Sequence, residues 1–305
     1  MGVLRTEVIG WEVSQGNGSR LFSRQGVKKM FLSVSHSREN IENLAKAVLQ
    51  DEYDSNEQLK FSYSKSIEKI RGIECDHDVK VQFHNSPIAR EAIRQGVFSE
   101  AADLDDKITI QSESYQMHCL NLYNEAIKLI EKKSIQLLQL IELVTTDVVF
   151  VHSPRIGGGT GSHLPGVICI SIGDDWTEVD VANTLVHEAT HLNVFLCDMV
   201  NKVFTSPASE LDKEEYRVLS AVRVGDMRPL DKAVHSAFVT VPLLYFEKLL
   251  GSCEMMKEFS VSLNDCVNGV VDKEFLFTQY GQQLVNQLRE FNESRDFSLV
   301  EKALI

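Results

Sequence analysis

Two histidines and a glutamate form the part of this sequence that is best suited to chemistry. They belong to the segment His187-Glu188-Ala189-Thr190-His191, which is an H-E-x-x-H pattern. Histidines four residues apart on a helix share one face and can bind one metal ion. Glu188 would lie about a hundred degrees further around the helix, where it can reach a water molecule beside the metal. A pair of buried core histidines is the alternative, and the pattern favours the metal site.

A catalytic metal site usually takes three protein ligands and leaves one position open. A metzincin would have a glycine and a histidine where this chain has Val194 and Cys197, and no N-E-x-x-D pattern follows. His235 is the only histidine after the motif, and we expect it to be the third ligand. A core or surface histidine is the alternative, in which case a carboxylate such as Glu210 or Asp226 would complete the site.

Two arginines lie between the motif and His235. Arg228 is followed by Pro229, whose fixed backbone would hold the arginine in one orientation. A guanidinium group fixed near a metal can bind both oxygens of a carboxylate, so Arg228 and Arg223 are candidate carboxylate ligands. The alternative for each is an ordinary surface ion pair.

The surrounding pattern predicts the elements that would position these residues. Thr177 and Asp180 form a capping-box pattern at the start of the motif helix. Apolar or alternating runs predict strands over residues 79–83, 148–151 and 166–171. Residues 51–66 and the glycine-rich 157–162 are expected to be loops. Further helices are expected from Ser37, from Pro87 to about Leu104, and from about Ser114 to Val144.

These elements predict an α+β fold in which the motif helix lies beside a small mixed sheet, in a zincin-like arrangement. We expect a mostly helical N-terminal region over residues 1–145, with a possible role in peptide recognition, and a metal-binding catalytic region over residues 146–305. Val167–Ser171 is the expected edge strand, and an extended peptide would pair with it. Gly157–Gly161 is expected to form a mobile rim near that strand, and His163 to be an ordinary polar residue.

Composition excludes some partners. The net charge is −13, from 31 basic and 44 acidic side chains, and this repels phosphate backbones. Neither a signal peptide nor a run of 18 apolar residues is present. The six cysteines are widely spaced, which is typical of reduced thiols. We therefore expect a cytoplasmic protein that binds neither nucleic acid nor membranes, while the oligomeric state stays open.

Three segments carry a resemblance to a known family. They are Thr184–Leu192 with the motif, the Arg223–Pro229 segment with its Arg-Pro pair, and Val234–Phe238. Together with Leu164-Pro165-Gly166 and the later Thr278–Leu284, they resemble the HExxH-type peptide-modifying proteins of bacterial ribosomal-peptide gene clusters. The resemblance covers about residues 160–290.

The resemblance implies an iron(II) and 2-oxoglutarate-dependent peptide β-hydroxylase rather than a protease. It would make His187, His191 and His235 the iron ligands, and Arg228, with Arg223, the 2-oxoglutarate ligands. The substrate would be a ribosomally synthesised peptide, which could be a leader-bearing precursor.

Three functions are compatible with the sequence at this point. The first is the 2-oxoglutarate-dependent hydroxylase, in which Glu188 would order groups around the metal. The second is a zinc metallopeptidase, in which Glu188 would be the general base. The third is a metal-stabilised binding protein without turnover. Imidazole ligands suit zinc and iron alike, so the ligand types do not decide between them.

Overall fold

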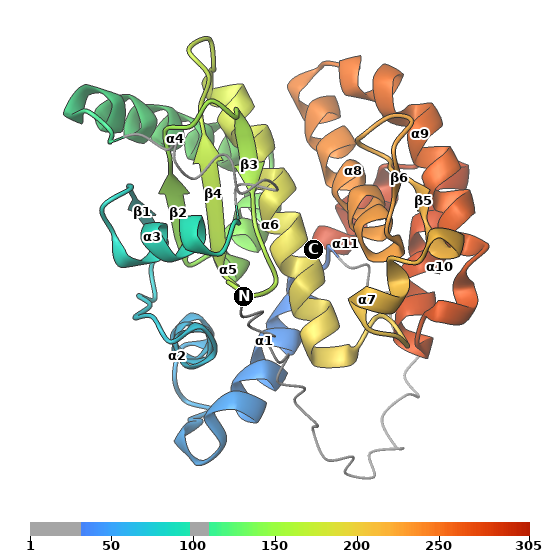
Figure 1. The fold of residues 1–305 in the computed structure, drawn as a ribbon, viewed down its shortest axis with the longest axis horizontal. Coiled ribbons are helices and arrows are strands. Elements are labelled where there is room, and N and C mark those ends of the chain that lie inside the picture. Colours follow the sequence, from blue (N-terminus) through green and yellow to red (C-terminus); the bar gives the residue numbers. More distant parts are fainter. Residues whose placement is uncertain (1–31, 98–109) are drawn as a thin grey trace, which may run out of the picture.

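The computed structural model of this chain describes residues 32–97 and 110–305. Within these ranges helices dominate, and they surround one small sheet (Figure 1). The helices are α1 Val34–Leu49, α2 Leu59–Arg71, α3 Pro87–Arg94, α4 Glu113–Lys133, α5 Ile135–Val144, α6 Glu178–Asn201, α7 Ala208–Leu211, α8 Leu230–Leu250, α9 Glu254–Val271, α10 Gln279–Ser294 and α11 Ser298–Leu304. Single 3-10 turns cover Gln50–Glu52, Glu214–Tyr216 and Glu274–Leu276.

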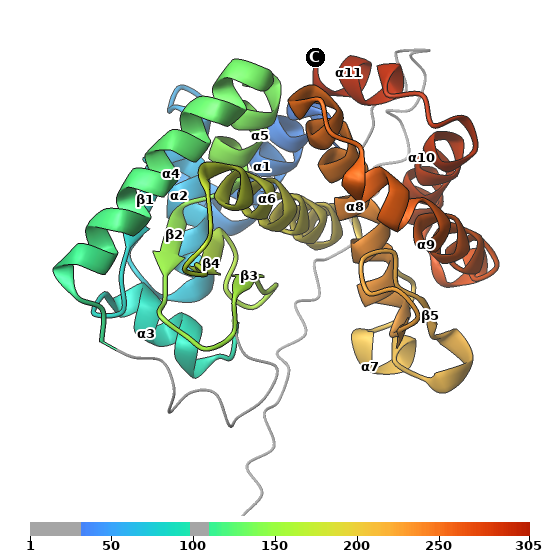
Figure 2. The same ribbon diagram turned by 90° about the horizontal axis from the view of Figure 1, so that it is seen from above.

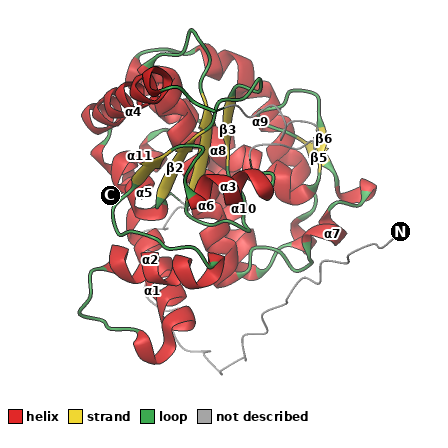
Figure 3. Ribbon diagram, turned by 60° about the vertical axis from the view of Figure 1, so that its left-hand side comes forward, coloured by secondary structure: helices red, strands yellow, loops and turns green. Residues whose placement is uncertain are grey.

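The main sheet has four strands in the order β1-β2-β4-β3. They are β1 Lys80–Gln82, β2 Asp147–Phe150, β3 Gly157–Gly159 and β4 Val167–Ser171. The first three strands in this order run parallel, and β3 pairs antiparallel with β4. A separate hairpin, β5 Val218–Leu219 with β6 Met227–Arg228, lies apart from this sheet (Figure 3). The predicted α+β class with a small mixed sheet is therefore confirmed.

Helices cover both faces of the main sheet, which explains why its central strands are apolar throughout. Val148, Phe150, Ile168 and Ile170 belong to the large core that also includes α1, α5, α6 and α8. The alternate residues of β2 and β4 pack with α3 in a smaller cluster on the opposite face. Because side chains alternate along a strand, each strand contributes to both clusters.

Helix α6 lies between the sheet and the C-terminal helices (Figures 1 and 2). The Thr177 backbone N–H donates to the Asp180 carboxylate at 2.8 Å, and this satisfies one amide at the start of the helix. The helix then packs against α8, α4, α1 and α5, and it contacts β3 and β4. The motif is therefore held on a long helix that is fixed from several sides.

Helix α8 is long and apolar enough to cross a membrane by length and composition, and it is the one such helix in the described ranges. It is also buried, with 83% of its most apolar window inside the molecule. A core helix of this kind passes the same hydropathy test, and here α8 supplies His235 to the interior.

Several predicted boundaries were wrong, and capping explains two of them. The helix expected over residues 114–144 is divided into α4 and α5, because Ser134 leaves the helical conformation and its hydroxyl accepts from the Leu137 amide. The first helix begins at Val34 rather than Ser37, with Ser33 as its N-cap.

Other differences concern segments whose polarity or length was misread. Helix α2 occupies part of the loop expected over residues 51–66. Helix α3 ends at Arg94, short of Leu104, and residues 98–109 lie outside the described ranges. Gly157–Gly159 is a strand rather than a loop, so it is β3 and not Val167–Ser171 that lies at the edge of the sheet.

A buried ion pair joins α2 to the sheet. Arg71 Nη1 lies 2.7 Å from Asp147 Oδ2, and these side chains are 0% and 3% exposed. The carboxylate also accepts from Gln82 and from the Thr146 hydroxyl. Replacing Arg71 by alanine would leave the buried Asp147 side chain without its cationic partner.

We expect Arg71→Ala to lower the free energy of unfolding by about 3–5 kcal/mol, the usual cost of removing one partner of a buried ion pair. Urea denaturation followed by circular dichroism measures this change. Arg94→Ala is the matched control, because Arg94 pairs with Glu91 on an exposed surface and should have little effect. Equal stability of the two variants would contradict the structural role of the Arg71–Asp147 pair.

Candidate metal centre

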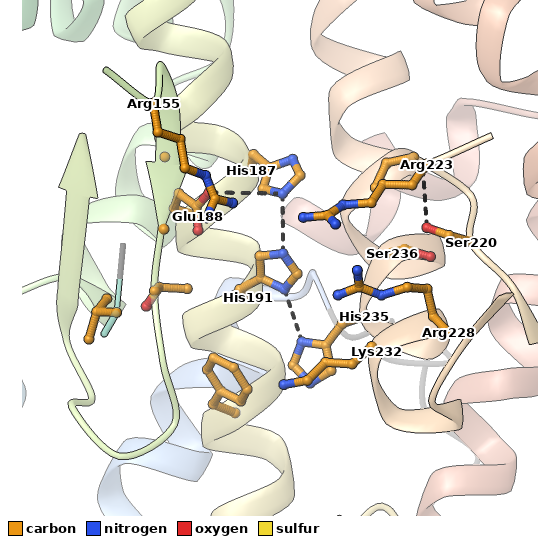
Figure 4. Close-up of a pocket in the computed structure, with 16 residues that line it drawn as sticks. Arg155, His187, Glu188, His191, Ser220, Arg223, Arg228, Lys232, His235 and Ser236 are labelled. Atoms are coloured by element: carbon orange, nitrogen blue, oxygen red, sulfur yellow. Dashed lines mark hydrogen bonds and ion pairs between the residues drawn. The ribbon is translucent and has the colours of Figure 1, made fainter. Parts of the chain in front are cut away.

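The three histidines that the sequence predicts to be metal ligands line one cavity. His187 and His191 extend from α6 and His235 extends from α8, across the contact between these two helices (Figure 4). His191 Nε2 lies 3.2 Å from His187 Nε2, and His191 Nδ1 lies 3.0 Å from His235 Nδ1. The sequence therefore identified three histidines that do lie side by side.

The distance between His187 and His191 suits one shared metal ion, whereas the His235 ring would have to turn to join them. Two nitrogens about 2.0–2.1 Å from one ion lie about 2.8–3.4 Å apart for bond angles between 90° and 109°. The Nε2 atoms of His187 and His191 satisfy this condition directly. His235, however, contacts the opposite nitrogen of His191, so its ring has to turn before all three nitrogens converge.

This arrangement explains why no group of three or more His, Cys, Asp or Glu side chains meets the geometry of a metal cluster within residues 32–97 and 110–305. The donor set still fits a borderline transition metal, because neutral imidazole nitrogens are ligands for zinc, iron and related ions. Phe195 supports the His235 ring, with 4.6 Å between the ring centroids.

Burial keeps the three imidazoles neutral. It lowers the pKa of His187 to about 4 and that of His235 to about 3, where the nearby charge of Lys232 acts in the same direction. The pKa of His191 is also well below its ordinary value because of burial, with the neighbouring histidines and Lys232 adding to the effect. Neutral rings can donate their lone pairs to a metal near pH 7 without first losing a proton.

Glu188 lies at the edge of the same cavity, between α6 and β3. Glu188 is 5% exposed, and its Oε1 atom lies 3.9 Å from His187 Nε2. Burial raises the pKa of Glu188 to about 8, against the opposing charge of Arg155. A bound divalent cation would favour the ionised form, since its positive charge stabilises a nearby carboxylate. The carboxylate is therefore placed to hold or move a proton beside the histidines.

A glycine lets β3 lie close to Glu188. A Cβ atom added at Gly158 would be 2.6 Å from Thr184 Cγ2 and 2.7 Å from Glu188 Oε1, both closer than side chains normally approach. Glycine at position 158 therefore leaves open the space that the Glu188 carboxylate occupies.

We expect Gly158→Ala to displace the Glu188 side chain and to lower at least tenfold any turnover that depends on this carboxylate, while metal content stays that of the wild-type chain. The reason is that the three atoms nearest to the added methyl belong to Thr184 and Glu188, and none of them belongs to a histidine. Steady-state rates and elemental analysis measure the two quantities. Gly173→Ala is the control, because the three atoms nearest to the corresponding Cβ are side-chain atoms of Asp175 and Trp176, at 3.0 Å or more. Wild-type turnover in Gly158→Ala would contradict the role given to Glu188.

Four cationic side chains and a single carboxylate, that of Glu188, line the cavity. The cationic residues are Arg155, Arg223, Arg228 and Lys232. Arg223 and Arg228 direct their guanidinium groups toward the histidines from one side, and Arg155 approaches Glu188 from the other (Figure 4). This is a local concentration of positive charge in a chain whose net charge is −13. The cavity has a volume of about 220 Å³, which suits a small anion rather than a macromolecule.

The β5–β6 hairpin positions two of these arginines. Arg228 lies in β6 opposite Val218, and Arg223 lies in the connecting turn, where Gly225 has a φ of +87°. The turn is anchored at Ala221, whose N–H donates to Ser236 Oγ at 2.9 Å and whose carbonyl accepts from Ser262 Oγ at 2.7 Å. Because Ser236 lies on α8 next to His235, the arginines and the third histidine share one support.

The sequence reasoning missed Arg155 and Lys232. Lys232 could have been found from its spacing, because it lies three residues before His235 on the same helix. Arg155 carried a weaker signal, which was its place shortly after the carboxyl end of a buried parallel strand. Of the remaining candidates, Glu210, Asp226 and His163 do not line the cavity, and His163 is exposed.

The comparisons with known proteins leave the site to be interpreted from its own chemistry. No protein-family model matches this chain, and no curated protein is significantly similar to it.

Proposed function

We propose that this protein is an iron(II) and 2-oxoglutarate-dependent oxygenase that hydroxylates a β-carbon in a ribosomally synthesised peptide. The observation that supports the proposal best is the combination of three neutral histidines with four cationic side chains around one small cavity. A peptidase site needs no cluster of cations beside its metal. A site for a small dicarboxylate next to a metal does, because a buried carboxylate without a partner is costly.

In this proposal His187 and His191 hold the metal through their Nε2 atoms, and His235 completes the set after its ring turns. Iron(II) held there would let molecular oxygen act as the oxidant, so that 2-oxoglutarate is converted to succinate and CO2, one oxygen atom enters succinate and the other converts a C–H bond of the substrate to C–OH. The zincin-like character of the motif helix is part of the same proposal.

The arginines bind the two carboxylates of 2-oxoglutarate. Arg228 is the better candidate for the distal carboxylate, because it is partly buried and held in a strand, whereas Arg223 is exposed in the turn. A guanidinium group can donate two parallel hydrogen bonds to a carboxylate, so Arg228 would fix the orientation of the molecule as well as its charge. Arg155 and Lys232 raise the local positive potential.

The peptide would lie along the outer edge of β3. This strand pairs with β4 on one side, and in the described part of the chain no strand pairs with its other side. An extended peptide can add to such an edge through backbone hydrogen bonds. Because β3 contacts α6 beside Glu188, a peptide paired there would pass across the cavity mouth. The substrate could be a leader-bearing precursor, and the setting would be the cytoplasm.

A zinc-dependent metallopeptidase remains the second candidate, and one observation favours it. Glu188 is buried beside the cavity with its Oε1 atom 3.9 Å from His187 Nε2. A hydrolase would use this carboxylate as general base toward water. In the oxygenase, the same carboxylate would accept a hydrogen bond from the substrate and so orient the reacting carbon.

Turnover assays with a peptide library separate these functions. With iron(II), ascorbate and oxygen, we expect 2-oxoglutarate to be converted to succinate and a subset of peptides to gain one oxygen atom by mass spectrometry. With zinc alone, we expect no cleavage. Peptide cleavage with zinc that is independent of 2-oxoglutarate and abolished by Glu188→Gln would establish the peptidase instead. Stoichiometric metal with neither reaction would support a binding protein without turnover.

A further inference from the structure

Helix α9 supports the hairpin that carries the two candidate carboxylate ligands. Arg228 lies in β6 and Arg223 in the connecting turn, and both guanidinium groups extend toward the histidines (Figure 4). Helix α9 packs against β5, the other strand of this hairpin. The helix is described over its whole length, and it contributes no residue to the lining of the cavity. Its contacts with the hairpin can therefore place the arginines without touching a bound ligand.

A glycine lets β5 lie close against α9. A Cβ atom added at Gly269 would be 2.6 Å from Val218 Cγ1, closer than side chains normally approach. Gly269 lies in the last turn of α9, where alanine would be the better helix former. Val218 is buried in this contact. The close packing of β5 on α9 therefore gives a physical reason for a glycine at position 269.

Val218 is also the residue that pairs with Arg228. In the register of the hairpin, Val218 lies opposite Arg228. Directly opposed residues of an antiparallel pair have Cβ atoms about 4.5–5.5 Å apart, so a displacement of Val218 is passed on to the backbone of Arg228. The distance between Gly269 and Val218 thus helps to set the point from which the Arg228 side chain extends.

A second contact fixes the turn of the hairpin to the same helix. Ser262 Oγ donates to the Ala221 carbonyl at 2.7 Å, and Ala221 lies two residues before Arg223. The Phe259 carbonyl is a more distant acceptor for this hydroxyl, at 3.2 Å. Ser262 and Ala221 are both buried. Loss of the hydroxyl would leave the Ala221 carbonyl without this donor inside the protein, which destabilises the observed position of the turn.

Helix α9 is in turn attached to the helix that carries the third histidine. Cys266 Sγ donates to the Ala233 carbonyl on α8 at 3.3 Å, and α8 and α9 pack along each other. His235 follows Ala233 by two residues on α8. The hairpin and His235 therefore have a common support, and a change in the contact between α9 and the hairpin alters the spacing between the arginines and the histidines.

We propose that Gly269 and Ser262 are positioning residues of the carboxylate site, which set the spacing between Arg228 and the candidate metal ligands. A dicarboxylate held at one end by a metal presents its other carboxylate at a distance fixed by its number of carbons. The spacing therefore determines which length of dicarboxylate the cavity accepts, because paired hydrogen bonds to a guanidinium group require a defined geometry. This inference rests on the proposed function in taking 2-oxoglutarate to be the dicarboxylate.

Gly269→Ala tests the packing contact in the metal-loaded chain. Calorimetric titration should show 2-oxoglutarate binding weakened about fivefold or more, at unchanged metal content, because the displaced guanidinium group no longer meets the distal carboxylate. The ratio of the affinities for 2-oxoglutarate and for 2-oxoadipate, which is one carbon longer, should change about threefold or more. Adding Val218→Ala removes the overlapping methyl groups and should restore both quantities to within about twofold of the wild-type values.

Ser262→Ala tests the second contact. It should weaken 2-oxoglutarate binding about threefold or more and accelerate hydrogen–deuterium exchange of the amides of residues 219–226, since the turn loses a buried hydrogen bond. Ser260→Ala is the matched control and should change neither quantity. Ser260 lies on the same helix, and its hydroxyl donates to the Met256 carbonyl within that helix.

The exchange measurement needs no ligand, so failure of this inference can be distinguished from failure of the proposed function. A wild-type chain that does not bind 2-oxoglutarate would contradict the proposed function, and equal exchange in Ser262→Ala and Ser260→Ala would then overturn the support by α9 as well. If the wild-type chain binds 2-oxoglutarate, an unchanged affinity ratio in Gly269→Ala would overturn the positioning role. A lower melting temperature with that ratio unchanged would show that Gly269 acts on stability alone.

Discussion

Replacing His191 by alanine is expected to lower the affinity for iron(II) or zinc by more than about 100-fold, since the loss of even an outer-shell partner costs 10–100-fold. His191 is the central ring of the three, and its Nε2 and Nδ1 atoms contact His187 and His235 at 3.2 and 3.0 Å. Its removal therefore takes away one ligand and the contact that holds the other two in line. The loss of affinity is measured as the metal content after dialysis, by inductively coupled plasma mass spectrometry.

The His191→Ala result needs two controls, one for correct folding and one for the removal of a histidine elsewhere in the chain. Circular dichroism of the metal-free proteins should give similar helix content for the wild-type chain and the variant. His77→Ala should keep full metal content, because His77 is 56% exposed and pairs with Asp76 and Asp78 on the surface. Full metal in His191→Ala would refute the site on these three rings.

Replacing Arg228 by alanine is expected to weaken 2-oxoglutarate binding at least tenfold, which corresponds to about 1.4 kcal/mol. The loss of one partner from a buried charge pair costs about 2–5 kcal/mol or more. The minimum expected here is smaller, because Arg228 is only partly buried. Metal content should stay near that of the wild type, since Arg228 is not among the proposed ligands. Calorimetric titration of the metal-loaded protein with 2-oxoglutarate measures the affinity.

Three variants give the Arg228 measurement its specificity. Arg228→Lys should recover part of the affinity, because it restores the charge but not the paired hydrogen bonds. Arg223→Ala should act more weakly, as expected for an exposed residue in a turn. Arg289→Ala is the control, because Arg289 is exposed on α10, donates to Asn286 and does not line the cavity. Equal affinity in Arg228→Ala and wild type would refute the role of Arg228.

The sequence was most informative where one local rule determined the structure. The Thr177 and Asp180 cap, the i, i+4 histidines and the two buried strands all depend on neighbouring residues, and each was predicted close to its observed position. The meeting of His235 with His191 could also be anticipated, because few histidines were available.

The remaining features depend on contacts between distant segments. Gly157–Gly159 has the composition of a loop, and it becomes a strand because β4 supplies hydrogen-bond partners and α6 leaves room only for glycine at position 158. Arg155 reaches the cavity because this same strand brings the preceding residues over α6. A cavity of about 490 Å³ next to the first is lined by residues of α6, α8 and α9 together, so no single segment of sequence indicated it.

The most direct test of the proposed oxygenase is an anaerobic titration that needs no peptide. A complex in which 2-oxoglutarate chelates iron(II) gives a visible charge-transfer absorption band that neither iron(II) nor 2-oxoglutarate gives alone. We expect this band to saturate with one equivalent of iron(II) in the wild-type chain, to be absent in His191→Ala and to require at least tenfold more 2-oxoglutarate in Arg228→Ala. A chain that binds one equivalent of metal but develops no such band at saturating 2-oxoglutarate would contradict the proposed function.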